Sequence, residues 1–168
     1  ANAFWGTIGL VLLSGFLKKY FNDTLVATTL LILFFGTNLY YYTAFDAGLS
    51  HVFSFAAFAG TLRFIDLAFD TGRLRHLLLT SLCLGLVIIT RPSNAVLLIL
   101  VTLWCFGSLN DVKIRIRWIN RNTGKVILAG FILFAILALQ LAYWKYITGR
   151  WIHFSYEEEG FNFLQPEI

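Results

Sequence analysis

The stretch TRPSN, residues 90–94, separates two apolar runs, residues 77–90 and 95–109. Proline lacks an N–H and disfavours helical backbone at the residue before it, so a helix over the first run should end near Arg91. The serine or asparagine that follows the proline is suited to cap the next helix. At 1.5 Å per residue each run makes a helix of roughly 21 to 23 Å, shorter than the ~30 Å hydrocarbon layer of a bilayer. The stretch therefore predicts two short apolar helices joined by a polar hinge.

Arg91 is the charged residue of this hinge, and two interpretations of it stay open. A guanidinium at membrane depth costs roughly 2.5 to 3.5 kcal/mol, and polar backbone is tolerated there only inside protein or beside a wet cavity. Arg91 is then either a loop residue whose side chain extends to the lipid headgroups, or a cation presented to an anionic ligand.

Composition places the hinge in a membrane protein. The chain is 58% hydrophobic and only 13% charged, and apolar runs recur along its whole length, which is typical of a polytopic helical membrane protein. We expect an all-α fold with about six transmembrane helices, at residues 1–17, 24–44, 49–69, 77–90, 95–109 and 126–147. Residues 148–168 would begin an extracytoplasmic loop or domain.

The loop charges predict the orientation of these spans. The net charge of +4 would suit nucleic acid, but the basic residues cluster in alternate loops. This distribution follows the positive-inside rule. It predicts membrane lipids as partners and no nucleic acid. Lysines and arginines mark residues 18–19, 73–75 and 110–125 as cytoplasmic, so the hinge is external. In residues 110–125 cations alternate with isoleucines, and we expect this segment to lie along the inner leaflet with its cations toward anionic headgroups.

Two helical patterns in the third run predict its neighbours. His51 and Ser54 share a stripe that would face the hinge if the third and fourth spans pack together, which places His51 and Arg91 at the same membrane level. Ala56 and Gly60 form a small-residue contact suited to close helix packing.

The third run also carries two opposite charges toward its cytoplasmic end. Arg63 and Asp66 are three residues apart, the spacing of neighbours on one helix face, and we expect them to pair with each other. Cys83 and Cys105 lie inside apolar runs without metal or redox spacing and are interpreted as packing residues.

No zinc spacing, glycine-rich phosphate loop or serine nucleophile elbow is found in the sequence. The polar residues that remain map to the external side: Asp46, His51, Arg91, Asn94, Lys145, Tyr156 and the acidic run Glu157, Glu158 and Glu159. Structural roles compete with ligand binding at several of them. His51 is suited to a cap or to packing, Asp46 to a turn, and three adjacent carboxylates cannot all face one substrate.

Three blocks of this sequence resemble bacterial membrane-embedded glycosyltransferases of the C-type superfamily, relatives of protein O-mannosyltransferases and lipid A aminoarabinose transferases. The blocks are YYT at residues 41–43 with GLSHVFSF at 48–55, RPSN at 91–94, and YWKYITG at 143–149 with SYEEEGFNF at 155–163. The resemblance implies a multi-pass protein of the bacterial inner membrane that transfers a sugar from a polyprenyl-phosphate donor to an acceptor on the extracytoplasmic face. The sugar and the acceptor are not readable.

The resemblance also implies site residues. The substrate-binding candidates are Arg91, His51, Lys145, Asn94, Asp46, Tyr156 and Glu159, with Arg91 and Lys145 as the cations for the departing lipid phosphate. The catalytic carboxylate of such enzymes is expected upstream of Ala1, so this stretch alone should be inactive. The pair Asp46-Ala47 departs from the proline-containing turn that the family has there. The resemblance therefore supports Asp46 as a site residue only weakly.

No cofactor is assigned, and a divalent metal would belong to the complete enzyme. Two other classes of function stay open. A transporter or channel would require broken helices with charged groups near the midplane of the membrane. A non-catalytic membrane scaffold would lack the upstream acid.

Overall fold

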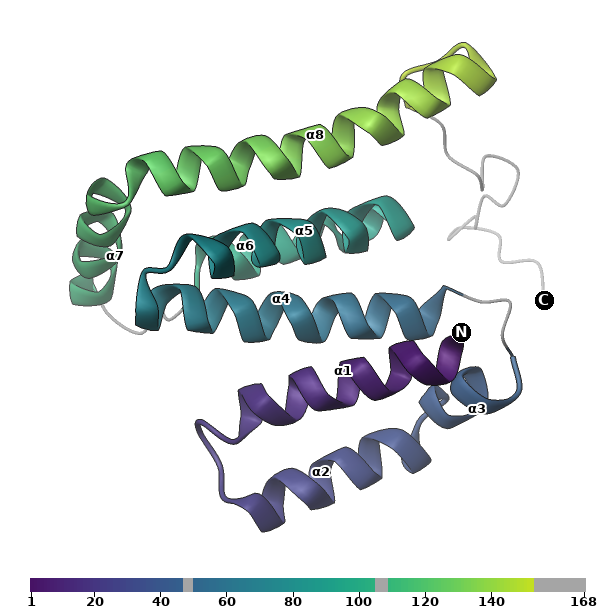
Figure 1. The fold of residues 1–168 in the computed structure, drawn as a ribbon. Helices are drawn as coiled ribbons and strands as arrows, with labels where there is room; N and C mark the ends of the chain where they lie inside the picture. Colours follow the sequence, from purple (N-terminus) through teal and green to yellow (C-terminus); the bar gives the residue numbers. More distant parts are fainter. Residues whose placement is uncertain (47–49, 105–108, 153–168) are drawn as a thin grey trace, which may run out of the picture. The chain divides into compact units, whose positions relative to one another are not determined.

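The computed structural model describes residues 1–46, 50–104 and 109–152, which form helices and no strand (Figure 1). The predicted all-α class is confirmed for these residues. In chain order the helices are α1 (Asn2–Leu17), α2 (Asp23–Gly36), α3 (Leu39–Ala44), α4 (His51–Thr71), α5 (Leu74–Thr90), the 3-10 helix η1 (Pro92–Val96), α6 (Leu97–Thr102), α7 (Leu109–Arg121) and α8 (Thr123–Thr148). The chain divides into two compact units, Ala1–Leu137 and Ala138–Ile168.

Helix α4 is the centre of the first unit, because it packs against both α1 and α5 (Figure 1). Small residues allow the close approach. A Cβ added at Gly9 of α1 would lie 3.1 Å from Ala56 Cα, and one added at Gly60 would lie 2.7 Å from Cys83 Sγ of α5. The predicted small residues both lie where helices approach closely: Ala56 meets Gly9 of α1, and Gly60 lies beside Leu12 of α1 as well as Cys83 of α5.

The second predicted span, residues 24–44, is not one continuous helix. Helix α2 ends at Gly36, Thr37 is extended, and α3 starts only at Leu39. The Thr37 hydroxyl donates to the Leu33 carbonyl at 2.6 Å and accepts from the Leu39 N–H at 3.2 Å. A threonine that bonds to nearby backbone in this way competes with the helical ladder, and the preceding glycine lowers helix propensity.

The fifth predicted span, residues 95–109, is also interrupted. After the hinge the chain forms η1 and the six-residue α6, which ends at Leu103. Four residues of the run, 105–108, lie outside the described residues. The 3-10 turn takes up the first part of a run that composition alone assigns to one helix.

Two of the described helices, α4 and α8, are long and apolar enough to cross a membrane, whereas α1, α2, α5 and the segment Pro92–Thr102 are shorter apolar helices. The prediction of about six spans is therefore not confirmed. Phe131 and Phe134 in the first half of α8 are 65% and 66% exposed. Large aromatic side chains exposed in this way favour contact with lipid or with another protein.

The end of α4 opposite His51 is held by ionic and aromatic contacts. Asp66, only 2% exposed, pairs with Lys19 at 2.8 Å and accepts a hydrogen bond from the Tyr20 hydroxyl at 2.5 Å. The predicted pair of Arg63 with Asp66 is wrong, because the turn after α1 brings a lysine to the same carboxylate. Lys125 at the start of α8 donates to the Gly72 carbonyl at 2.6 Å, and Gly72 is in the left-handed region at φ 59°.

Candidate functional site

The hinge positions Arg91 at the end of α5. Its backbone N–H still donates to the Val87 carbonyl at 3.2 Å, but the residue is extended, at φ −148° and ψ 115°. This is the conformation that Pro92 favours in the residue before it, and helix α5 ends at Thr90 as predicted. The Arg91 side chain leaves the helix end and is exposed.

Asn94 stabilises the hinge by a bond that the sequence did not predict. Its side-chain amide donates to the Val87 carbonyl at 3.1 Å, and its backbone N–H donates to the Arg91 carbonyl at 2.9 Å. The expected capping of the following helix by Ser93 or Asn94 is wrong, since η1 has no side-chain cap. Asn94 instead adds a second donor to the Val87 carbonyl, which already accepts from the Arg91 N–H, and so ties the hinge to the last turn of α5.

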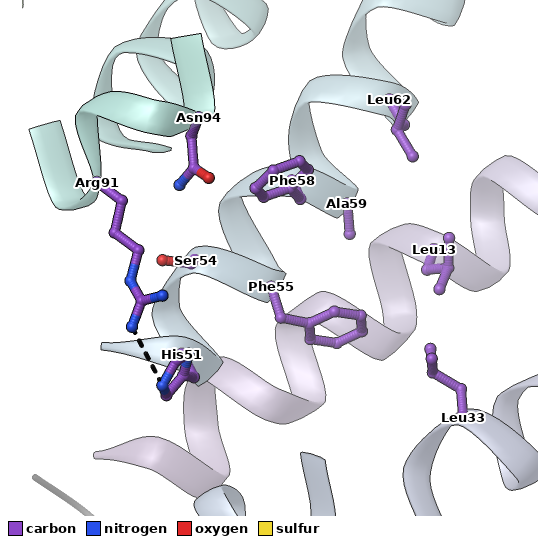
Figure 2. Close-up of a pocket in the computed structure, with 10 residues that line it drawn as sticks. All are labelled: Leu13, Leu33, His51, Ser54, Phe55, Phe58, Ala59, Leu62, Arg91 and Asn94. Carbon is purple, nitrogen blue, oxygen red and sulfur yellow. Dashed lines mark hydrogen bonds between the residues drawn. The ribbon is translucent and has the colours of Figure 1, made fainter. Parts of the chain in front are cut away.

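Arg91 and His51 are in direct contact, with 3.3 Å between Arg91 Nη2 and His51 Nε2 (Figure 2). A guanidinium has donors only, so His51 Nε2 is the acceptor of this hydrogen bond. The other side of the ring stacks on Tyr42, with centroids 4.6 Å apart and planes 20° apart. The two residues lie together at one end of the α4–α5 pair, as the shared stripe predicted.

A cavity of about 470 Å³ opens beside this pair. Its polar end is lined by His51, Ser54, Arg91 and Asn94 (Figure 2). Its apolar part is lined by Leu13 of α1, Leu33 of α2, and Phe55, Phe58, Ala59 and Leu62 of α4. The cavity thus combines a cation at one end with a hydrocarbon-lined groove.

The groove follows one face of α4. Its residues 51, 54, 55, 58, 59 and 62 recur at intervals of three and four, which is the period of a single helix face. From His51 to Leu62 this face extends for about 16 Å along the helix axis. The site therefore suits an amphiphile with an anionic group and an apolar chain.

Ser54 is the residue that the sequence placed on the stripe but not among the binding candidates. Its hydroxyl oxygen is buried and has no hydrogen-bond partner among the described residues. It lies beside Arg91 and Asn94 at the polar end of the cavity (Figure 2). A buried hydroxyl without a partner costs free energy, and a bound anion would accept its hydrogen bond.

The remaining predicted binding residues are Asp46, Lys145, Tyr156 and Glu159. Asp46 is absent from the cavity lining, and its backbone carbonyl accepts from the Asn2 side chain at 3.2 Å, in line with a turn role. Lys145 belongs to the second unit, where its ammonium donates to the Gly149 carbonyl at 2.6 Å and lies 5.8 Å from the Trp151 ring centroid. Tyr156 and Glu159 lie outside the described residues.

Metal ligation has no candidate in the described part of the chain, where no three His, Cys, Asp or Glu side chains form a group. Comparison of the chain with family models, with curated proteins and with solved structures found no match.

Proposed function

We propose that this chain is part of a multi-pass inner-membrane glycosyltransferase and that the Arg91 cavity binds its polyprenyl-phosphate-linked sugar donor. One observation carries the proposal: a single cavity joins an exposed guanidinium to an apolar groove along α4. A lipid-linked phosphate has the same two parts, an anion and a long hydrocarbon chain. The resemblance of the hinge and of residues 48–55 to membrane glycosyltransferases supports the same ligand class.

Arg91 would act on the phosphate as the glycosidic bond breaks. Negative charge grows on the departing phosphate in that step, and a fixed guanidinium stabilises it more in the transition state than in the ground state. The planar fork of arginine also matches two phosphate oxygens at once. His51 accepts from one Nη and so orients the guanidinium, and the Ser54 hydroxyl supplies a second donor beside it.

The groove would hold the isoprenoid part of the donor. Phe55, Phe58 and Leu62 belong to its apolar lining, and each buried CH₂ of a lipid chain contributes about 0.8 kcal/mol. The phosphate is then held at the polar end and the chain runs along α4. In this arrangement α4 and α8 cross the membrane, and α1 and α5 pack against α4.

A binding measurement on the purified chain tests the proposal without the need for turnover. Undecaprenyl phosphate should bind far more tightly than undecaprenol or inorganic phosphate, because only the first ligand uses both parts of the site. Arg91→Ala should weaken binding about ten- to hundredfold, the scale of one charge-assisted hydrogen bond, and Arg91→Lys should retain part of the affinity. Arg73→Ala, an exposed cation outside the cavity lining, is the matched control. Unchanged binding by Arg91→Ala would show that the arginine is only a hinge residue.

A transporter of the same amphiphile is the second candidate. The breaks at Thr37 and at η1 favour it, because discontinuous helices are typical of transporters. An assay in sealed vesicles that contain the protein distinguishes the two functions. A transporter moves a fluorescent polyprenyl phosphate between leaflets, whereas a transferase consumes the sugar-linked donor and releases the lipid phosphate.

A further inference from the structure

Helix α7 presents two different surfaces away from the protein. Lys113, Arg117 and Arg121 follow one another at intervals of four, so they form one basic face, and all three are exposed. Ile116 and Ile119 lie on the neighbouring face and are 53% and 39% exposed. We call the two faces together the α7 outer surface.

The third side of α7 is fixed to the protein. Arg115 is buried, donates to the Trp104 carbonyl, and lies 3.1 Å from the Phe69 ring centroid. Trp118 meets the same Phe69 ring edge-on, with centroids 4.7 Å apart. Phe69 is in the last turn of α4, so α7 is held at the end of α4 opposite His51 (Figure 1). The expectation that all cations of this segment point to headgroups is therefore wrong for Arg115.

The cations of the outer surface have no such role inside the protein. The side chains of Lys113, Arg117 and Arg121 make no hydrogen bond or ion pair with any residue that the structure describes. Internal packing therefore explains neither these three charges nor the exposure of Ile116 and Ile119. Three unpaired cations beside exposed isoleucines suit a partner that offers negative charge and an apolar layer together.

We infer that the α7 outer surface docks on a bilayer that contains anionic lipids, with the isoleucines in the acyl boundary and the three cations among the headgroups. The fit is one of charge and polarity, because a basic face next to an apolar face is typical of helices that lie in the membrane interface. Each lysine or arginine near an anionic surface raises partitioning about fivefold. A nucleic acid would use the cations but leave Ile116 and Ile119 in water.

The test places a fluorescent probe on α7 in the full chain, reconstituted in lipid nanodiscs. Asn120 lies between the basic and the apolar face and is exposed, so an environment-sensitive dye on Asn120→Cys disturbs neither face. Cys83 and Cys105 are replaced by alanine in this background. In phosphatidylcholine discs that contain phosphatidylglycerol, the dye emission should shift to the blue and iodide should quench it less than in discs of phosphatidylcholine alone.

Two variants separate this proposal from simple attraction of a basic protein. Lys113→Gln with Arg117→Gln and Arg121→Gln should abolish the dependence on phosphatidylglycerol, since three cations together account for about a hundredfold in partitioning. Ile116→Arg with Arg117→Ile keeps composition and net charge but mixes the two faces, and it should also lose the shift. Helix content from circular dichroism checks that both variants fold.

The remaining outcomes overturn the inference. Insensitivity of native α7 to phosphatidylglycerol would contradict it, and so would a full response of the glutamine variant. Retention of the shift in the exchanged variant would leave only net charge as the cause and would equally contradict an ordered interface helix.

Discussion

At the scale of single residues, Asp66 shows how a charge is held inside this bundle. Burial lowers the pKa of the Lys19 ammonium, but its hydrogen bonds to Asp66 and Asp70 outweigh that effect and raise the pKa above its ordinary value. Burial and the hydrogen bond to Asp66 likewise raise the pKa of Tyr20. Lys19 therefore stays charged and Tyr20 stays neutral at physiological pH. Both donate to the Asp66 carboxylate, whose side chain is only 3% exposed.

Replacement of Lys19 by glutamine should destabilise the fold through this carboxylate. We expect the free energy of unfolding in detergent to fall by about 1 to 2 kcal/mol. This loss is smaller than that for a fully buried ion pair, because the Lys19 side chain is 35% exposed. Lys18→Gln is the matched control, since the Lys18–Asp23 pair is exposed at 56% and 85%, and its loss should cost less than about 0.5 kcal/mol.

The stability difference between the native chain and Lys19→Gln depends on pH with a definite sign. A group whose pKa is raised in the folded state contributes its stability fully below the unfolded pKa, about 10.4 for lysine, and loses it as pH rises through the folded pKa. The gap between the native chain and Lys19→Gln should therefore be constant from about pH 6 to 9. A gap that closes within this range would contradict the assignment of Lys19 as the partner of Asp66.

At the scale of elements, the α1–α4 contact depends on Gly9. A Cβ at this position would lie 2.5 Å from Phe55 Cε1 and 3.1 Å from Ala56 Cα. Gly9→Ala should lower the free energy of unfolding by about 1 to 2 kcal/mol, because overpacking outweighs the gain in helix propensity. Gly130→Ala in α8, where a Cβ meets nothing within 4 Å, should be neutral or stabilising by about 0.5 to 1 kcal/mol. Equal effects of the two substitutions in thermal unfolding would contradict this packing.

Which elements could be predicted depends on how local their causes are. The end of α5 before Pro92 was predictable, since proline acts on the adjacent residue. The break at Thr37 was not, because a threonine inside an apolar run is compatible with helix until its hydroxyl bonds to the backbone. The partner of Asp66 was missed for a different reason: spacing within one helix offers Arg63, whereas the fold brings Lys19 from 47 residues away.

At the scale of the whole molecule, the larger part of the candidate site follows from sequence and a smaller part from tertiary contact. His51, Ser54, Phe55 and Phe58 belong to one stripe, and the hinge supplies Arg91 and Asn94, so their meeting required only that α4 and α5 pack together. Leu13 and Leu33 come from α1 and α2, and no spacing in the sequence relates them to α4. Lys145 was grouped with Arg91 by loop side and by the resemblance, and neither of these gives a distance.

The two ends of α4 predict a two-sided topology. The helix has 21 residues and is about 31 Å long, which matches the ~30 Å hydrocarbon layer. Arg91 contacts His51 at its first residue, and α7 contacts Phe69 in its last turn, so the hinge and α7 should face opposite compartments. The test uses a background without Cys83 and Cys105. A cysteine at the exposed Ser93 should react with an impermeant thiol reagent in intact bacteria. A cysteine at the exposed Thr123 should react only after the membrane is opened. Labelling of both positions from the same side would exclude α4 as a membrane-spanning helix, and labelling of Thr123 alone would reverse the orientation and move the Arg91 cavity to the cytoplasmic face.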